Sequence, residues 1–521
     1  MFVRGFHNRE RHERINATST ITRGLRPDIV ELMRICLLTN QNLDETPPSD
    51  DWLCDPRPFL PDADWDVLVL EKENAVRRVM NAARLGYDLF FNLCDGAWDE
   101  DTPGIEVVHT LERLEVPFTG ASSEFYEPTR EAMKRVCRAS DIHTPEYAFA
   151  YDEAALLRAG KMLDFPLIVK HPSSYASIGL TSASRVETRE ALFEQGMRML
   201  SEFGGALIEE FIEGIEATVL VAENATDPGR PITFQPMRYR FPDGETFKHA
   251  DMKWVDYRLM ECVPVTERPL DRRLRQVAAR FFRGLNGVGY GRCDLRIDAR
   301  GRPFMLEINP NCGIYYSPED AGSADLCLLH DPAGHVGFTR RIVEAALARH
   351  ERERKCWTVV PENGGYKLVA TRGIRAGDRI LPFEGRPHEL VTLSHVERHW
   401  DEEALDAFRR YAWPLTDEVW VTWSHDPHQW KPVNHSCEPT AWLEGLDLVA
   451  RHDLSAGQEI TIDYATFYNE RMPSFECACG ADRCRGTIHG DDYLKDFVAR
   501  YGGHVSDYVR RRRESPRAIE T

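Results

Sequence analysis

The sequence predicts a multidomain protein in which an α/β part is followed by a mostly β part of the α+β class. The chain has 521 residues, too many for one hydrophobic core, which favours two to four domains. Up to about residue 348, short apolar strand-like runs alternate with segments of helical spacing. Residues 357–490 are instead rich in short β-like pieces, glycine and proline, with one helix expected near residues 396–411. The charge-dense run 349–356 predicts a linker between the two parts.

The α/β character of the first part rests on a βαβ pattern. Residues 66–70 and 89–93 are short apolar runs of the kind found in buried parallel strands. Between them, residues 74–85 have helical spacing, with apolar side chains on one face. This order predicts an α/β module.

Composition and charge limit the classes of function. The hydrophobic fraction is 42%, as in ordinary globular proteins, and no apolar run approaches the ~20 residues that span a bilayer. The formal net charge of −19 argues against a general nucleic-acid binder; solubility explains it, with a cationic partner as the alternative. The N-terminus lacks the apolar stretch of a secretory signal, and nine cysteines are scattered singly. We therefore expect a cytoplasmic protein without membrane or nucleic-acid partners.

Two strand-like segments carry the first set of chemical groups. Residues 291–298 and 305–311 both have the character of strands, and a turn at 300–302 joins them. The two-residue period of a strand aims two carboxylates, one amide and one guanidinium into a single cleft. Such oxygen ligands suit Mg²⁺, which prefers a few carboxylates together with nucleotide phosphates. These groups belong to Arg292, Asp294, Glu307 and Asn309.

Three lysines lie upstream of this hairpin. Lys134, Lys170 and Lys253 are each expected at a strand end or a helix start, where an ammonium group could contact phosphate. Any one of them alone would be interpreted as a surface lysine or a structural ion pair. Their order, together with the hairpin, resembles the D-alanine–D-alanine ligase branch of the ATP-grasp superfamily over about residues 34–317. The motifs that carry this resemblance are 133–134, 165–170, 173–179, 209–216, 291–298 and 305–311.

The resemblance implies an ATP-grasp fold and a set of site residues. ATP would be bound by Lys134, Lys170, Glu209, Phe211, Ile212, Glu216 and Lys253. Asp294, Glu307 and Asn309 would hold Mg²⁺, and Arg292 and Ser177 of the covering loop would be catalytic. The implied reaction phosphorylates a carboxylate with ATP, after which an amine displaces phosphate from the acyl phosphate. Positioning and charge stabilisation would supply most of the catalysis, with Arg292 at the tetrahedral oxyanion.

The family's substrates do not carry over to this sequence. The family holds its first amino acid through a Gly-Gly-x-Ser-x-Glu segment after the first strand, and residues 40–48 lack it. Residues 313–318 replace those that hold the carboxylate of the second D-alanine. We therefore expect small-molecule substrates, an amino acid or peptide pair other than two D-alanines. By analogy with the family, the protein is expected to form a homodimer.

Four of the 13 cysteines form the second set of chemical groups. Cys477, Cys479 and Cys484 have C-x-C-x4-C spacing, and Cys437 can supply a fourth thiolate if the fold returns to it. Such a cluster could also be a redox pair. The Asn-His-Ser-Cys motif that ends at Cys437 favours a closed tetrahedral Zn²⁺ site, which is a structural one.

Three motifs of the second part, 434–440, 459–464 and 477–486, together resemble the SET domain with its post-SET cysteine loop. The resemblance covers about residues 358–488 and implies a mostly β fold with a knotted core. S-adenosylmethionine would be held by Gly365, Tyr366, Asn434 and His435. Tyr464 would be the catalytic tyrosine beside a channel in which a neutral amine attacks the sulfonium methyl group.

This sequence departs from the SET pattern at three positions. Thr440 stands where the family has asparagine, and Ile462 stands two residues before the tyrosine, where the family often has phenylalanine or tyrosine. The Tyr-x-Gly motif of an earlier strand is Phe-Glu-Gly at 383–385. These departures indicate an unusual acceptor rather than a histone-like lysine.

The leading hypothesis for function is a bifunctional enzyme of natural-product biosynthesis that joins a carboxylate to an amine and methylates an amine. Two alternatives remain. One is a SET methyltransferase acting on a lysine-bearing peptide or protein, with the ATP-grasp part as a scaffold. The other is a ligase with a SET region that only binds a partner. The predicted segments are an extension (1–32), an α/β substrate subdomain (33–120), ATP-grasp subdomains (121–348), the linker (349–356), the SET domain (357–474), the zinc loop (475–490) and a C-terminal helix or tail (491–521).

Overall fold

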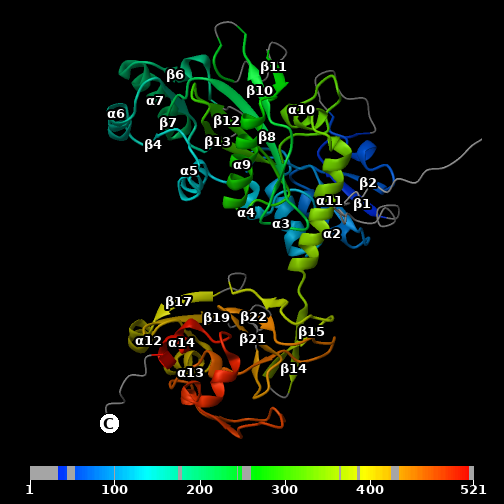
Figure 1. Cartoon of the computed structure of the whole chain (residues 1–521), viewed down its shortest axis with the longest axis vertical. Helices are drawn as coiled ribbons and strands as arrows, with labels where there is room; N and C mark the ends of the chain where they lie inside the picture. The colour runs from blue at the N-terminus through cyan, green and yellow to red at the C-terminus, as the bar shows by residue number, and fades with distance from the viewer. Residues whose placement is uncertain are drawn as a thin grey trace, which may run out of the picture. The chain divides into compact units, whose positions relative to one another are not determined.

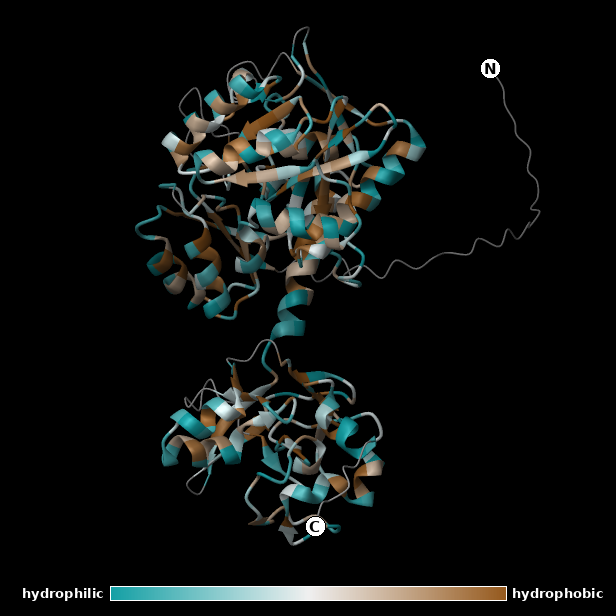
Figure 2. Cartoon of the chain, turned by 90° about the vertical axis from the view of Figure 1, so that its left-hand side faces the viewer, coloured by the Kyte–Doolittle hydropathy of each residue, from teal (hydrophilic) through white to brown (hydrophobic). Residues whose placement is uncertain are grey.

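The chain divides into two compact units, Met1–Glu353 and Arg354–Thr521, whose helices and strands are labelled in Figure 1. The computed structural model describes residues 33–43, 53–98, 100–173, 179–242, 245–248, 260–362, 365–383, 388–423 and 433–514. Among these residues, no helix is both long enough and apolar enough to cross a membrane. Apolar residues concentrate on the strands and on the inner faces of the helices in each unit (Figure 2).

The first unit begins with a three-stranded parallel sheet in the order β2-β1-β3. The central strand β1 is almost fully buried, as its unbroken apolar run requires. The helix after β2 keeps its apolar face on the sheet, so the predicted βαβ unit is confirmed. The elements are β1 (Arg34–Thr39), η1 (Arg57–Phe59), β2 (Asp64–Val69), α2 (Ala75–Ala83), β3 (Leu89–Asn92), α3 (Ile105–Arg113) and α4 (Ser123–Tyr126).

A four-stranded sheet in the order β4-β7-β5-β6 follows, with α6 and α7 packed on it. Side chains that accept a hydrogen bond from the first turn start three helices of this part of the chain: Thr129 caps α5, Asp152 caps α6 and Thr188 caps α7. The elements are α5 (Arg130–Ala139), β4 (Tyr147–Ala150), α6 (Glu153–Met162), β5 (Leu167–Lys170), η2 (Ser182–Ser184), β6 (Arg185–Val186), α7 (Arg189–Phe203) and β7 (Ala206–Glu210).

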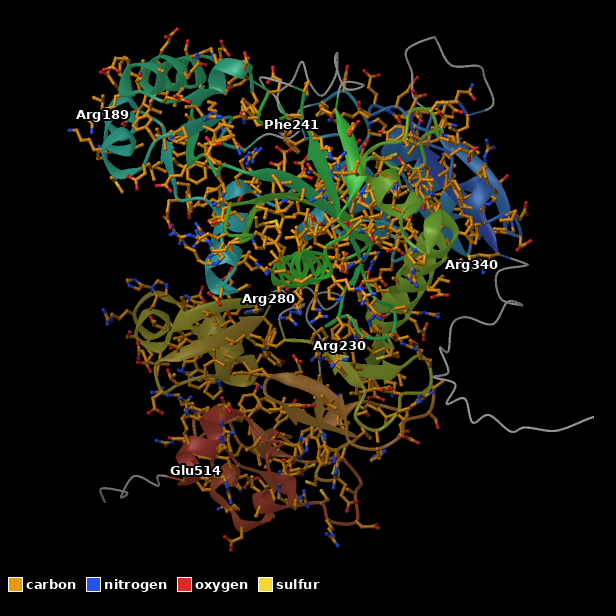
Figure 3. The ribbon with its side chains drawn as sticks, turned by 45° about the horizontal axis from the view of Figure 1, so that its top comes forward. Arg189, Arg230, Phe241, Arg280, Arg340 and Glu514 are labelled. Carbon is orange, nitrogen blue, oxygen red and sulfur yellow. The ribbon has the colours of Figure 1, made fainter. Side chains whose placement is uncertain are left out.

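The largest sheet of the unit is antiparallel, with the path β11-β10-β8-β12-β13 and β9 paired to β8. Helix α9, on which Figure 3 labels Arg280, packs on β8 and β13 through Leu274, Ala278 and Phe281. The elements are β8 (Ile215–Ala222), β9 (Ile232–Thr233), β10 (Met237–Arg240), β11 (Glu261–Pro264), α9 (Arg268–Gly284), β12 (Tyr290–Ile297), β13 (Pro303–Pro310), α10 (Ser323–Leu329) and α11 (Gly334–Glu353).

The second unit consists of short two- and three-stranded sheets around a main apolar core, with two smaller apolar clusters beside its helices. The helix expected near 396–411 is two helices, α12 and α13. The chain is extended at Trp400, and Asp401 then starts α13 as its N-cap by accepting a hydrogen bond from Ala404 N at 2.9 Å. The strands β20 and β23 pair in parallel, and the predicted knot stays a prediction. The strands are β14 (Trp357–Glu362), β15 (Gly365–Ala370), β16 (Arg379–Leu381), β17 (His388–Thr392), β18 (Trp413–Pro414), β19 (Val419–Trp423), β20 (Asn434–His435), β21 (Ala441–Glu444), β22 (Asp447–Ala450), β23 (Thr461–Ile462), β24 (Phe475–Glu476) and β25 (Thr487–Ile488). The helices are α12 (Leu393–His399), α13 (Glu402–Tyr411), η4 (Tyr464–Thr466), η5 (Gly490–Leu494), η6 (Asp496–Tyr501) and α14 (Asp507–Glu514).

Candidate active sites

The hairpin of β12 and β13 brings the four predicted groups of the first unit together. Arg292 lies opposite Asn309, and Asp294 lies opposite Glu307, in the antiparallel register. The register shifts after Asp294, a bulge of the kind that re-aims side chains beside active sites. All four line a cleft of about 890 Å³. The predicted hairpin is therefore confirmed, and its polar groups face one cavity.

Each carboxylate of this hairpin has an arginine partner. Arg292 donates from Nε and Nη2 to the two oxygens of Asp294 at 3.2 and 3.0 Å, and Asn309 Nδ2 donates to Asp294 Oδ2 at 3.2 Å. Glu307 Oε2 lies 2.6 Å from Arg130 Nη1 of α5. Burial alone would raise the pKa of Asp294, but Arg292, Lys248 and the hydrogen bond from Thr218 together outweigh it and lower that pKa. Two carboxylates and an amide, open to a cleft with room for phosphates, are a donor set that fits Mg²⁺.

A second group of charges centres on the buried Glu209. Its carboxylate contacts the ammonium group of Lys134 and lies 2.6 Å from Lys170 Nζ. Burial alone would raise the pKa of Glu209, but the two lysines outweigh it and lower that pKa. Lys134 also donates to Thr144 Oγ1 at 2.6 Å and is itself buried. Of the two lysines, Lys170 is the one that lines the cleft.

In the segment after Glu209, two arginines lie over the buried ring of Phe211. The guanidinium of Arg296 lies 4.4 Å from the centroid of the Phe211 ring, and that of Arg185 lies 4.5 Å from it. Arg296 also donates to the carbonyl of Ile212 at 2.6 Å and to Glu216 Oε2 at 3.4 Å. Glu216 lines the cleft as well. Arg296 thus fixes the conformation of residues 211–216, because it binds both a main-chain carbonyl and a carboxylate of this segment.

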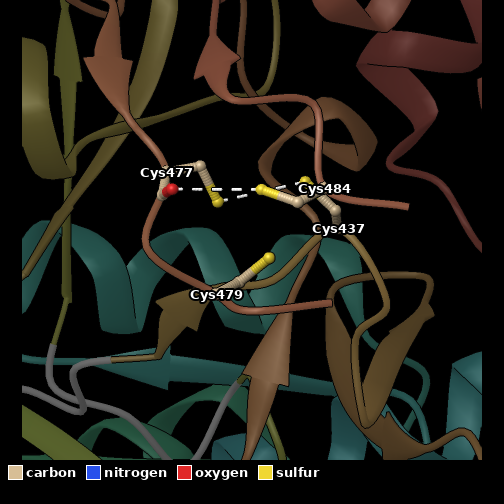
Figure 4. Close-up of side chains that lie close together, drawn as sticks. All are labelled: Cys437, Cys477, Cys479 and Cys484. Atoms are coloured by element: carbon tan, nitrogen blue, oxygen red, sulfur yellow. Dashed lines mark hydrogen bonds between the residues drawn. The ribbon is translucent and has the colours of Figure 1, made fainter. Parts of the chain in front are cut away.

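In the second unit, four thiols converge. The Sγ atoms of Cys437, Cys477, Cys479 and Cys484 all lie within 4.8 Å of one another, and they point toward a common centre (Figure 4). A tetrahedral zinc with Zn–S bonds of about 2.3 Å would place its sulfurs about 3.8 Å apart. The distance of 4.0 Å between the sulfurs of Cys437 and Cys477 is close to that value. The residues therefore fit a structural Zn²⁺, which would close the loop that carries three of them.

The residues expected to hold S-adenosylmethionine lie on β15 and β20, two strands of separate sheets that a side-chain hydrogen bond connects. Asn434 Nδ2 donates to the carbonyl of Tyr366 at 3.2 Å and to Glu459 Oε1 at 2.9 Å. The imidazole of His435 is directed inward: Nδ1 accepts from the main-chain N–H of Tyr464 at 3.2 Å, and Nε2 lies 3.4 Å from Cys437 Sγ. Burial lowers the pKa of His435 to about 4, so the ring is neutral at pH 7. The structure thus joins Asn434 to β15, which begins at Gly365.

Tyr464 lies at the start of η4 inside an aromatic cluster. Its hydroxyl donates to the carbonyl of Val433 at 3.1 Å, and burial raises its pKa. Its ring is next to those of Phe467, Tyr468 and Phe475. Tyr464 thus lies among three other aromatic rings, with its hydroxyl held by the main chain.

The geometry of both units agrees with comparisons with known proteins. The family model described as D-ala D-ala ligase C-terminus matches residues 140–317, and that of the SET domain matches residues 365–465. A D-alanine–D-alanine ligase of Chromohalobacter salexigens is 30% identical over 235 residues, which are 44% of this chain and 67% of the relative. The chain belongs to the D-alanine–D-alanine ligase family. Its second unit contains a SET domain.

Other relatives of this ligase-family chain cover the same part of it. A D-alanine–D-alanine ligase of Cupriavidus pinatubonensis is 28% identical over 243 residues, 46% of this chain and 71% of the relative. The crystal structure of D-alanine–D-alanine ligase from Bacillus anthracis with ATP is 18% identical, with a TM-score of 0.43 over 62% of this chain and 99% of that one. The VanG D-Ala:D-Ser ligase of Enterococcus faecalis is 13% identical, with a TM-score of 0.43 over 60% and 99%.

Three residues of the ligase-family chain were missed by sequence reasoning. Arg296 continues the alternation of Arg292 and Asp294 along β12, so the two-residue period could have found it. Lys248 lines the cleft, with Nζ 3.6 Å from the centroid of the Tyr239 ring, in a region where the motif drew attention to Lys253. Asp463 directly precedes the predicted Tyr464, and no spacing marks it. Of the predicted residues, Ser177 and Lys253 lie outside the described part of the chain.

Proposed function

We propose that the first unit is an ADP-forming carboxylate–amine ligase that works through an acyl phosphate. The observation that carries this proposal is the hairpin of β12 and β13, which turns Arg292, Asp294, Glu307 and Asn309 into one cleft with Lys170. Phosphoryl transfer needs little covalent chemistry from the protein, so charge and positioning suffice. Mg²⁺ held by Asp294, Glu307 and Asn309 would neutralise the transferred phosphoryl group.

In the proposed reaction, a carboxylate oxygen of the donor attacks the γ-phosphorus of ATP, and ADP leaves. A neutral amine then attacks the carbonyl carbon of the acyl phosphate. Arg292 would meet the negative charge on the tetrahedral oxyanion, because its guanidinium faces the cleft beside Asp294. Collapse of this intermediate releases phosphate that carries the donor's carboxylate oxygen, and the amine loses its proton.

The two substrates are proposed to differ from the D-alanine pair named for the relatives. Tyr316 lines the cleft in the segment that departs from the family pattern. The cleft is also lined by Asp95, Glu100, Glu319 and Asp320, and among the described residues these four form no ion pair. Carboxylates repel the carboxylate of a free amino acid and attract ammonium groups. The charge therefore favours an amine acceptor with an additional cationic group.

We propose that the SET domain of the second unit is an S-adenosylmethionine-dependent N-methyltransferase acting in the same biosynthetic route. Its support is the clustering of Tyr464 with aromatic rings and the link from Asn434 to Tyr366. Tyr464 and its neighbours would align a neutral amine with the methyl group. The two alternatives keep only one catalytic unit: a protein-lysine methyltransferase with an ATP-grasp scaffold, or a ligase with a SET module that binds a partner.

The ligase proposal is tested by phosphate release from ATP and Mg²⁺ with a panel of carboxylate donors and amine acceptors, with product masses recorded. The acceptors include amino acids, dipeptides, amino-acid amides and diamines. An amide that disappears in Arg292→Ala, and persists in the control Arg302→Ala on an exposed turn, supports the proposal. Amide formation that survives Arg292→Ala overturns it.

The methyltransferase proposal is tested by calorimetry with S-adenosylmethionine and by methyl transfer to the amide product and to lysine peptides. Tyr464→Phe should abolish methyl transfer and leave amide formation unchanged. Methylation of lysine peptides without any amide synthesis would favour the scaffold alternative. Amide synthesis without binding of S-adenosylmethionine would favour the binding-module alternative.

A further inference from the structure

Asp463, the residue before the proposed catalytic Tyr464, is the centre of a buried hydrogen-bond network. Its side chain is fully buried. Arg485 donates to both carboxylate oxygens, from Nη1 at 2.7 Å and from Nη2 at 2.8 Å. Tyr501 donates its hydroxyl at 2.7 Å, and Arg500 Nη2 lies at 3.3 Å. Two-point binding by a planar guanidinium fixes direction as well as distance.

The same carboxylate shapes the helix that carries Tyr464. Asp463 is the N-cap of η4, and its Oδ1 accepts a hydrogen bond from the N–H of the second helical residue, Ala465, at 3.0 Å. The N–H of Tyr464 is directed to His435 Nδ1 at 3.2 Å. The orientation of Tyr464 therefore depends on Asp463 through the cap and on His435 through the main chain.

Arg485 also belongs to the cysteine loop. It directly follows Cys484, and its main-chain N–H lies 3.4 Å from the sulfur of Cys437. Its Nε is paired with Asp492 Oδ2 at 3.2 Å. Arg485 thus contacts the sulfur of Cys437 in the four-cysteine site through its main chain and binds Asp463 through its side chain.

We propose that Arg485 is a positioning residue that couples metal loading of the four-cysteine site to the placement of Tyr464 and to binding of S-adenosylmethionine. The proposal rests on the methyltransferase function proposed for this unit. A metal ion that closes the loop holds Arg485 on Asp463. When the loop opens, the buried carboxylate loses its two-point partner, which is unfavourable, and it can no longer keep its cap on η4. The altered η4 then disturbs Tyr464 and its contact with His435, next to Asn434.

The test uses the full chain loaded with Zn²⁺, the variant Arg485→Met and the matched control Arg483→Met. Arg483 lies in the same loop between two of the cysteines, but its side chain is exposed, and its nearest acidic partner is 4.0 Å away. Three quantities are measured with and without a chelator: zinc content, the affinity for S-adenosylmethionine and hydrogen exchange of the peptide covering 463–468. The conservative variant Arg485→Lys keeps the positive charge without the two-point geometry. It therefore distinguishes the loss of this geometry from a general loss of folding.

Removal of zinc is expected to weaken S-adenosylmethionine binding by about 10- to 100-fold, the size of effect seen when a residue that orients a metal ligand is lost. Hydrogen exchange of residues 463–468 should become faster. Arg483→Met should behave as the wild type. Arg485→Met should keep its zinc, bind S-adenosylmethionine as weakly as the chelated wild type, and respond little to the chelator. Arg485→Lys should fall between the two.

Two results would overturn the coupling. In one, zinc-loaded Arg485→Met binds S-adenosylmethionine and protects 463–468 like the wild type. In the other, chelation has the same effect on the variant as on the wild type. If no form binds S-adenosylmethionine while exchange of 463–468 follows zinc and Arg485 as expected, the positioning role stands and the methyltransferase function fails.

Discussion

The two candidate active sites hold their charged groups in opposite ways. In the cleft of the first unit, the side chains of Arg292 and Asp294 each keep 14% of their surface exposed, and that of Glu307 keeps 25%. In the SET domain, the side chain of Asp463 is completely buried under Arg485, Arg500 and Tyr501. The cleft keeps its charges available for a substrate, whereas the SET domain uses a charge to hold its own chain together.

This difference in burial determines whether a substitution changes activity alone or activity and stability together. The charged groups of β12 and β13 lie on a hairpin that is held by its main-chain ladder and by the apolar core beneath it, so they can be changed at little cost to the fold. The motif residues around Tyr464 both form the site and satisfy buried polar groups. Substitutions should therefore separate activity from stability in the first unit and change both together in the second.

The largest expected effect is that of Asp463→Asn. An amide cannot accept the two-point pair from Arg485, so this guanidinium loses its fully buried partner and keeps only its pairing with Asp492; breaking a buried pair costs about 3–5 kcal/mol. We expect the free energy of unfolding of the second unit to fall by this amount in urea denaturation. Phosphate release by the first unit should not change. A loss below about 1 kcal/mol, the size of an exposed ion pair, would contradict the picture of a structural charge.

Arg292→Ala is expected to have the next largest effect, on rate rather than on folding. Removing one group that stabilises an oxyanion lowers kcat about 10²- to 10³-fold, or roughly 2.7–4 kcal/mol. Because Arg292 lines the cleft, the midpoint of urea unfolding should stay close to that of the wild type. Steady-state kinetics and denaturation of the same preparation check both points, and a strongly destabilised variant with full kcat would refute the assignment.

The smallest expected effect compares equivalent helix caps in the two units. Thr188 caps α7 of the first unit, and Asp401 caps α13 of the second. Replacement of either by alanine should cost about 1 kcal/mol, because one N–H in the first turn loses its acceptor. Each loss should appear only in the transition of its own unit, as followed by calorimetry. A change in both transitions would show that the units do not unfold separately.

The parts of the structure that local spacing determines were predictable from the sequence. Strand alternation placed Arg292, Asp294, Glu307 and Asn309 on one hairpin, and that pairing is confirmed. The four thiols also converge as the cysteine spacing predicted. The metals, the nucleotide and the catalytic roles stay proposals.

The residues that were missed depend on tertiary neighbours. Asp463 gains its importance only when Arg485 and Tyr501 fold over it, from segments 22 and 38 residues away. Arg296 takes its partners Ile212 and Glu216 from 84 and 80 residues away, and Lys248 lies over the ring of Tyr239 on β10. The helix break before Asp401 was hidden because the apolar spacing continues through it, while the cap is a single side chain.

The most direct test of the ligase reaction is the fate of a labelled oxygen. Donor amino acids with ¹⁸O in the carboxylate are incubated with ATP, Mg²⁺ and the amine panel, and phosphate, AMP and ADP are analysed by mass spectrometry. An acyl phosphate requires one labelled oxygen in the released phosphate for each amide formed, with ADP as the other product. Label in AMP, or amide formation with unlabelled phosphate, would contradict the proposed reaction.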